Sequence, residues 1–214
     1  MSSSNNHKGW WDSSIIQVRS NELLIKGYPI EDLMGRVSYG EMAYLMVIGE
    51  LPPHPKIKNL IEALLVAVCD HGANSPAVST AIMGATCGIP LNCVMASGMN
   101  LLGEIHGGPI EAATKLFYET DRIIREGQST PEEVINNICQ QYFENKQYLP
   151  GFGHPVHDKD PRVVRLFDMI EEVQHEGVVS GRFMKLAKMY EQILPKIFSK
   201  SKIPINVDGG GAVI

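Results

Sequence analysis

The sequence lacks the patterns that mark several common classes of protein. Its net charge of −5 over 214 residues includes no cluster of Lys and Arg, which binding to a nucleic-acid backbone requires. No apolar stretch is long and uninterrupted enough to cross a bilayer, and the start of the chain lacks the apolar run of a signal peptide. These absences argue against nucleic acid and membrane as partners, and they favour a cytoplasmic protein.

Several catalytic motifs are also missing. The cysteines form no C-x-x-C pair, and most sit in apolar stretches, so we expect reduced core thiols: Cys69, Cys87, Cys93 and Cys139. No G-x-S-x-G elbow supports a serine nucleophile. Gly209-Gly210-Gly211 is not followed by Lys, and no strand precedes it, so it does not fit a phosphate-binding loop.

What the sequence does contain is helical periodicity, and no strand–helix alternation of the kind that builds a parallel sheet. A short hairpin is predicted over 15–28, before two short helices in 29–49. Nearly all-round apolar helices, expected to be buried on several sides, follow at 56–71 and 75–105. Beyond Gly107-Gly108-Pro109 the predicted helices are amphipathic, which marks a candidate domain boundary; they cover 110–126, 131–146, a segment after Asp160-Pro161-Arg162, and 180–199.

Four polar segments interrupt this pattern, and each places a titratable group beside glycine or at a helix end: 70–76, 104–108, 151–154 and 206–211. Glycine lets a ligand approach the backbone closely, and free amides at a helix start bind anions or orient a histidine. None of the four is specific alone. A metal site at His154, His157, Asp158 and Asp160 is the first alternative, but Pro155 and the lack of a second ligand cluster argue against it.

The order of the segments is more specific, because five of them resemble the citrate synthase superfamily, including its citryl-CoA lyase type, in the family's own order. They are GYPIEDLMGRVSYGEMAYLMVIGELP, CDHGANSP, EIHGG, PGFGHPVHDKDPR and NVDGGG. The resemblance implies catalytic roles for His106, His154 and Asp208. Asp208 removes a proton from the methyl carbon of acetyl-CoA, His106 hydrogen-bonds the thioester oxygen as the enol forms, and His154 polarises the acceptor ketone. Cleavage of citryl-CoA uses the same groups in reverse.

The resemblance also implies binding residues. His71, Asn74 and Arg162 match positions that hold a small di- or tricarboxylate such as oxaloacetate. The alternative for Arg162 is a surface ion pair at a helix start. The loop formed by Pro150, Gly151, Phe152 and Gly153 resembles the family's coenzyme A contact, with the CoA thioester as substrate and no covalently bound cofactor or metal.

The fold implied by the resemblance is all-α, with a large and a small domain and a homodimeric assembly. We expect a disordered tail over 1–9, the large domain over 10–107, the small domain over 108–208, and the start of a return to the large domain over 209–214. The family's further C-terminal helices, with their acceptor-binding arginines, do not follow, so the sequence reads as truncated. A catalytically impaired relative that serves as a CoA-binding or dimerising module is therefore the alternative. Neither the direction of the reaction nor the preferred 2-oxo acid can be predicted.

Overall fold

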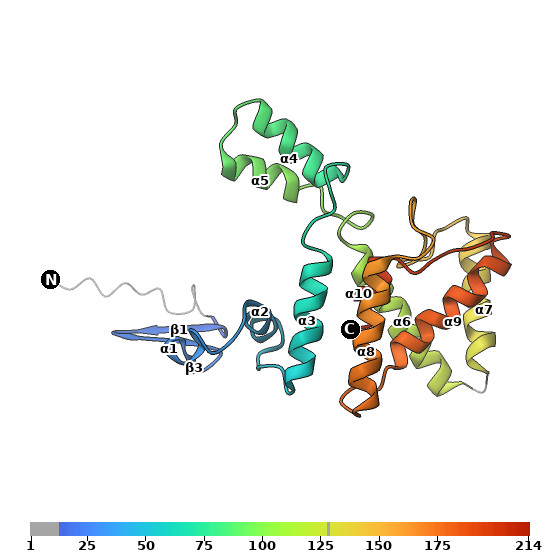
Figure 1. Cartoon of the computed structure of the whole chain (residues 1–214), viewed down its shortest axis with the longest axis horizontal. Coiled ribbons are helices and arrows are strands. Elements are labelled where there is room, and N and C mark those ends of the chain that lie inside the picture. The colour runs from blue at the N-terminus through green and yellow to red at the C-terminus, as the bar shows by residue number, and fades with distance from the viewer. Residues whose placement is uncertain (1–12, 128) are drawn as a thin grey trace. The chain divides into compact units, whose positions relative to one another are not determined.

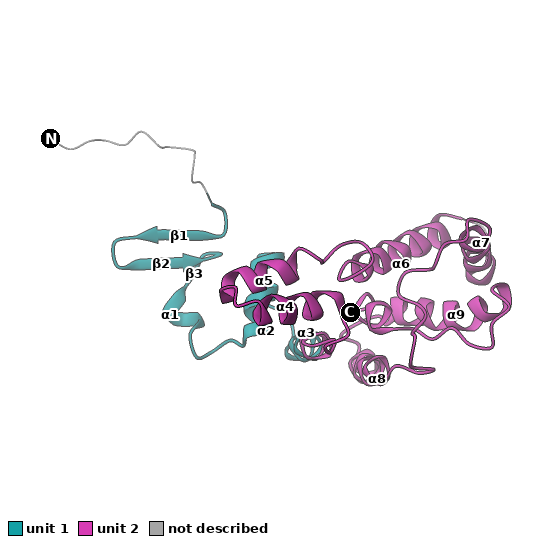
Figure 2. Cartoon of the chain, turned by 90° about the horizontal axis from the view of Figure 1, so that it is seen from above, with its two compact units in different colours: residues 1–62 teal, residues 63–214 magenta. Residues whose placement is uncertain are grey.

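The computed structural model describes residues 13–127 and 129–214, and the predicted tail over 1–9 lies outside them. Helices dominate this part of the chain (Figure 1). The chain divides into two compact units, residues 1–62 and 63–214 (Figure 2). This division concerns packing within the chain, so the predicted large and small domains stay predictions.

The first unit contains a small antiparallel sheet in the order β1-β2-β3. Its strands are β1 (Ile16–Arg19), β2 (Glu22–Ile25) and β3 (Tyr28–Pro29), with Ile16 opposite Ile25. Asn21, which has a φ of 59°, turns the chain between the first two strands, because Asn tolerates the left-handed region better than most residues. The predicted hairpin is thus confirmed.

Two short helices follow, as predicted: α1 (Ile30–Leu33) and α2 (Tyr39–Ile48). The hydroxyl of Ser38 accepts from the amide of Glu41, and the Glu41 carboxylate accepts from the amide of Ser38, which forms a capping box. Glu62, on α3 (Pro55–Ala67), accepts a hydrogen bond from the Gly40 amide at 3.0 Å and one from the Ser38 hydroxyl. This carboxylate thereby ties the start of α2 to α3.

The second unit begins with a helical hairpin, α4 (Pro76–Thr86) and α5 (Leu91–Met99), which pack against each other. Gly88, with a φ of 77°, and Pro90 break what the sequence suggests is one apolar stretch. The prediction that these helices are buried on several sides is wrong for the single chain. No residue of α4 is buried, and α5 buries only Val94 and Gly98. The physical reason is that, among the described residues of the second unit, α4 and α5 pack mainly against each other, so most of their apolar surface stays exposed.

The cysteines divide in the same way. Cys139 is fully buried, and burial raises the pKa of its thiol to about 12, which keeps it protonated and inert. The prediction of core thiols is wrong for Cys69, Cys87 and Cys93, which are exposed. Cys69 lies just after α3, Cys87 follows α4, and Cys93 is in α5.

The main core of the second unit lies among five further helices: α6 (Pro109–Glu126), α7 (Pro131–Glu144), α8 (Pro161–His175), α9 (Arg182–Ile197) and α10 (Val207–Gly211). At its centre the fully buried Tyr190 shares a 2.6 Å hydrogen bond with Thr120, and its ring packs on Phe117 and Phe152. The helices over 109–175 begin with Pro at the first turn, and this signal made their starts predictable.

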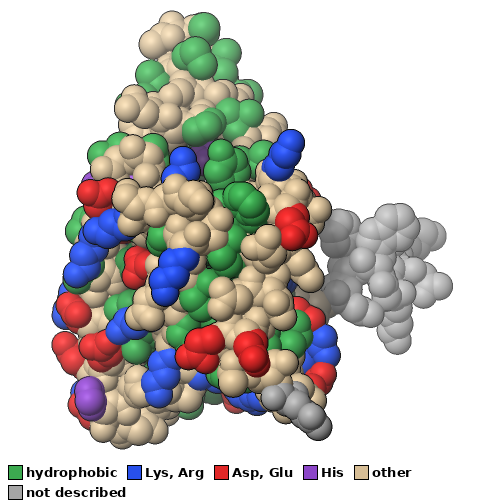
Figure 3. Space-filling model, turned by 90° about the vertical axis from the view of Figure 1, so that its right-hand side faces the viewer, with side chains coloured by type: hydrophobic (Ala, Val, Ile, Leu, Met, Phe, Trp, Pro, Cys, Tyr) green, Lys and Arg blue, Asp and Glu red, His purple; other side chains and the backbone are tan. Residues whose placement is uncertain are grey.

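Within the described residues no helix is long and apolar enough to span a bilayer. On the face drawn in Figure 3, cationic and anionic side chains alternate instead of gathering by sign. Ion pairs along one helix also place opposite charges next to each other, such as Arg122 with Glu119 and Glu126 on α6. Such exposed pairs contribute little to stability.

Candidate active site

Asp208 lies in the first turn of α10, a short helix that the sequence analysis did not predict because it consists largely of glycine. Asn206 caps this helix: its side-chain oxygen accepts from the amides of Asp208 at 3.0 Å and Gly209 at 3.2 Å. The cap fixes where the helix starts and therefore where the Asp208 carboxylate points.

The glycines of α10 serve close packing. A Cβ added to Gly209 would lie 2.3 Å from the carbonyl oxygen of Gly151, and one added to Gly210 would lie 2.9 Å from Val163 on α8. Gly151 has a φ of 84°, and an added Cβ there would meet the Gly209 Cα at 2.8 Å. Both backbones therefore meet directly, which only paired glycines allow.

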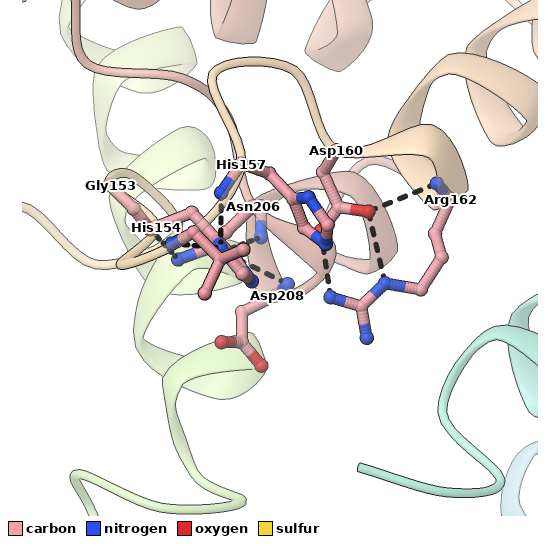
Figure 4. Close-up of polar contacts among 9 residues, drawn as sticks. Gly153, His154, His157, Asp160, Arg162, Asn206 and Asp208 are labelled. Carbon is pink, nitrogen blue, oxygen red and sulfur yellow. Dashed lines mark hydrogen bonds and ion pairs between the residues drawn. The ribbon is translucent and has the colours of Figure 1, made fainter. Parts of the chain in front are cut away.

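His154 follows this contact, in the loop that leads to α8. Its Nδ1 accepts hydrogen bonds from the amides of Val156 at 3.1 Å and His157 at 2.9 Å (Figure 4). A ring nitrogen that accepts hydrogen bonds carries no proton, so the neutral ring holds its proton on Nε2. Burial lowers the pKa of His154 and the charge of His157 lowers it further, while the carboxylate of Asp160 opposes them in part. His154 is thus a neutral imidazole that presents an Nε2–H donor.

The ring of His157 stacks on that of His154 with centroids 4.4 Å apart. The sequence analysis considered His157 only as a metal ligand. Among the described residues, no group of three or more His, Cys, Asp or Glu side chains is arranged to hold a metal ion.

Asp160 caps α8 and holds Arg162. The carboxylate of Asp160, which is buried, accepts from Nε of Arg162 at 3.0 Å and from Nη2 at 2.8 Å. Burial works against the charge of Asp160, but the Arg162 hydrogen bonds outweigh it and lower the pKa of this carboxyl. The ion pair at a helix start is therefore present, although it is not a surface pair. Because Asp160 occupies the Nε side of the fork, the Nη1 side of Arg162 faces away from it and is available to a ligand carboxylate.

His106 is half-buried in a tight loop. The amide of Gly103 donates to the His106 carbonyl at 2.7 Å, and the Gly108 amide donates to the Gly103 carbonyl at 2.9 Å. Gly107, with a φ of 89°, allows this turn. The loop holds His106 immediately before α6.

The carboxylate of Asp208 brings these groups together. Burial raises the pKa of Asp208, while the charges of His71, Arg162 and His106 partly offset this, so all three lie near enough to influence it. A raised pKa means a more basic carboxylate. Three candidates from distant parts of the second unit thus lie within electrostatic reach of Asp208: His71, His106 and Arg162. His154 is connected to this group through the charges of His71 and Arg162, which act on it too. Asn74 lies exposed in the turn after His71 and takes part in none of the hydrogen bonds that the structure shows around these residues.

The loop Pro150–Gly153 borders two hollows. One, of about 210 Å³, has mostly apolar walls that include Phe198, the residue that follows α9, with Lys200 and Lys202 among its lining residues. The other, of about 1040 Å³, extends from Pro150 to the loop that carries His106. The side chain of Phe152 is buried in the aromatic core, where its ring centroid lies 6.3 Å from that of Phe117. A ligand in this loop would therefore contact the backbone of Phe152.

One residue with a clear structural role in the site was missed by the sequence analysis. Asn206 appeared there only as part of a polar segment, yet its side chain also donates to the carbonyl of Gly153 at 3.0 Å. The available signal was Asn at the position before a short segment with an acidic residue, which is the preferred N-cap pattern.

Comparison with known proteins connects this geometry to a family. Residues 53–214 match the family model described as citrate synthase, C-terminal domain. The structure resembles that of citryl-CoA lyase from Hydrogenobacter thermophilus with a TM-score of 0.80 and 32% sequence identity, over 95% of this chain and 74% of that one.

More distant relatives extend the same picture. ATP citrate lyase from Methanothrix soehngenii, solved with citrate and coenzyme A, is similar with a TM-score of 0.78 and 22% identity, over 95% of this chain and 31% of that one. A Synechocystis citrate synthase is 24% identical over 166 residues, which is 77% of this chain and 39% of that protein. The chain thus spans well under half of that relative. These similarities confirm the predicted mostly helical, citrate synthase-like fold.

Proposed function

Since this chain belongs to the citrate synthase family, we propose that it forms or breaks the carbon–carbon bond between the acetyl group of acetyl-CoA and the keto carbon of a small acceptor such as oxaloacetate. The observation that carries the proposal is the environment of Asp208: a carboxylate made more basic by burial, within the electrostatic reach of His71, His106 and Arg162. The likeness to a citryl-CoA lyase supports cleavage of citryl-CoA as one direction.

In the bond-forming direction, Asp208 takes a proton from the methyl carbon of acetyl-CoA. A proton α to a thioester is too weakly acidic for a carboxylate unless a donor stabilises the developing enolate oxygen, and His106 supplies that donor. His154 donates a hydrogen bond from Nε2–H to the acceptor carbonyl and stabilises the alkoxide as it forms, while Arg162 and His71 hold acceptor carboxylates. The alkoxide becomes a hydroxyl by taking up a proton from solvent, and Asp208 gives its proton up to solvent. In cleavage, the proton movements reverse, and Asp208 returns the proton to the methyl carbon.

The experiment is to follow both directions with the purified chain. Formation of citryl-CoA from acetyl-CoA plus oxaloacetate, or release of free thiol where water then hydrolyses the citryl thioester, reports synthesis. Formation of acetyl-CoA from citryl-CoA reports cleavage. Turnover in either direction supports the proposal. Failure in both, together with no binding of acetyl-CoA, contradicts it. Binding of acetyl-CoA without turnover identifies the alternative, a catalytically impaired CoA-binding module.

The coenzyme A site is proposed at the loop Pro150–Gly153 and the adjoining apolar hollow. Adenine is flat and largely apolar, and the hollow offers apolar walls beside two cations, Lys200 and Lys202, that suit the nucleotide phosphates. The neighbouring ATP citrate lyase structure contains coenzyme A, which supports this class of ligand.

Replacing both lysines by alanine is expected to raise KM for acetyl-CoA about 100-fold, since each charge-assisted contact contributes about 1.5 kcal/mol, which is about tenfold in affinity. The kcat is expected to stay within about twofold, because these lysines hold the nucleotide end and not the reacting atoms. Lys196→Ala, an exposed change on α9 that does not line the hollow, is the control. A KM that stays unchanged in the double variant while Lys196→Ala behaves normally contradicts this site.

A homodimer is proposed to form through the α4–α5 hairpin. Its exposed face carries large apolar side chains that a monomer rarely leaves uncovered: Ile82, Met83, Leu91, Met95 and Met99. Neither helix contains a charged residue. An uncharged apolar face is complementary to itself, so a second copy of the chain is its natural occupant. A cytoplasmic location stays a prediction.

Met95→Glu is expected to convert the dimer to a monomer at micromolar concentration, because it buries an unpaired charge in each half of the interface. Light scattering coupled to size-exclusion chromatography measures the mass directly. Met34→Glu, at a methionine 70% exposed in the first unit, is the matched control for the 60% exposed Met95. A wild-type monomer, or a Met95→Glu dimer as stable as the wild type, contradicts the assignment.

A further inference from the structure

Two segments far apart in the sequence lie side by side at the site. The amide of Gly153 donates to the carbonyl of Pro204 at 2.7 Å, and the amide of Asn206 donates to the carbonyl of Gly151 at 3.1 Å. Between these bonds Phe152 and Ile205 form an antiparallel bridge. His154 continues from the first segment and Asp208 from the second, so this pairing decides how far apart the two groups stand.

The side chain of Asn206 links the same two segments a second time. Its Nδ2 donates to the carbonyl of Gly153, the residue before His154, and its Oδ1 accepts from the amide of Asp208 (Figure 4). An amide carries a donor and an acceptor on one rigid group. Asp at this position would have the acceptor without the donor, and Ser would be too short to reach both partners.

We propose that Asn206 is a positioning residue that sets the placement of His154 relative to Asp208, an inference that rests on the proposed function. Asn206 acts only through the backbone on either side of it. Proton transfer depends steeply on geometry, and a misplacement of about 1 Å can cost about 100-fold in rate. Because the Asn206 side chain holds both the segment that leads to His154 and the segment that leads to Asp208, its loss is expected to lower kcat more than it affects ligand binding or folding.

The surroundings of Asn206 confine this effect to the His154 side. The amide of Ile205 donates to the Glu191 carboxylate of α9 at 3.0 Å, and Gly209 packs directly on Gly151. These contacts hold the second segment and the start of α10 without the Asn206 amide. Loss of its donor removes the Asn206 hydrogen bond to the carbonyl of Gly153 and loosens the start of the loop that orients His154, which then depends on the bond from the Gly153 amide to Pro204.

Asn206→Ser separates positioning from capping, because Ser is also a favoured N-cap but is too short to reach Gly153. The variant is expected to lose about 10- to 100-fold in kcat, while KM for the acceptor stays within about threefold and the melting temperature falls by no more than about 4 °C. Asn137→Ser, on the exposed face of α7, is the control and is expected to match the wild type.

Amide hydrogen exchange gives a readout that needs no turnover. The amides of Val156 and His157 donate to Nδ1 of His154, so freeing the loop is expected to speed their exchange by about 10-fold or more. If the wild type is inactive in both directions and these amides still exchange faster in Asn206→Ser, the positioning role stands and the proposed function falls.

Two outcomes overturn the inference. In the first, exchange at Val156 and His157 is the same in Asn206→Ser as in the wild type, which makes Asn206 an N-cap and nothing more. In the second, kcat falls only in parallel with a large loss of melting temperature and a matching rise in acceptor KM, which indicates a general structural defect.

Discussion

Replacing Asp208 by Asn is expected to lower kcat by about 10³-fold in both directions, because the variant keeps the shape of the side chain but has no basic oxygen to accept the proton. KM for the acceptor is expected to change little, since His71 and Arg162 hold that ligand. Measuring thiol release and citryl-CoA cleavage under saturating substrate gives kcat directly. Asp168→Asn, an exposed change on α8, is the matched control.

The raised pKa of Asp208 also predicts how the stability of the folded protein changes with pH. Burial raises the pKa of this carboxyl in the folded protein, so ionising it costs folding free energy once the pH exceeds its unfolded pKa. The cost is absent at low pH and grows until the pH passes the folded pKa. Asp208→Asn removes this cost and is therefore expected to melt at the same temperature as the wild type or higher at pH 7.

The raised pKa also shapes the activity profile. The base must be ionised, so the acidic limb of kcat against pH is expected above the ordinary range of an aspartate. A limb at the ordinary value of a free carboxyl would mean that another group is the base. Equal losses of kcat and acceptor affinity in Asp208→Asn, with a lower melting temperature, would mean that Asp208 has a structural role.

The largest expected effect on stability comes from Gly209→Ala. Alanine normally favours a helix over glycine, yet here its Cβ would stand 2.3 Å from the Gly151 carbonyl and 2.9 Å from the Ile205 side chain. The Gly151 backbone cannot move away unless α10 moves too. The overpacking is therefore expected to lower the free energy of unfolding by about 3 kcal/mol. For a chain of this size that corresponds to a melting temperature lower by about 6–12 °C.

Gly103→Ala is the matched control for that change. An added Cβ at Gly103 would meet nothing within 4 Å, and this glycine has no positive φ. Its melting temperature is expected to stay within about 2 °C of the wild type. If Gly209→Ala proves as stable as Gly103→Ala, the direct contact between α10 and the loop at Gly151 is not what holds this part of the site.

Local signals made most of the helices predictable. The capping box at Ser38, the Thr130-Pro131 start and the Asp160 cap all act within one helical turn, so they depend on neighbouring residues alone. The helix α10 was not predictable in this way. Its glycines oppose helix formation locally, and the helix exists because Gly151, Val163 and Ile110 pack against it.

The main wrong prediction from the sequence is that the apolar helices are buried on several sides, and it too has a physical cause. An apolar sequence shows that a helix needs a partner, but not whether that partner belongs to the same chain. Within the described part of the second unit, α4 and α5 pack mainly on each other and leave Leu91 and Met95 exposed.

The sequence by itself determined the family resemblance, the order of the helices, and the identity of His106, His154 and Asp208 as the groups to examine, because residue types and local spacing carry that information. Only the tertiary structure decided the proton position on His154, the capture of Arg162 by Asp160, and the double role of Asn206. Each of these depends on which backbone group or side chain meets which in space, and hydrogen bonds act only over that short range.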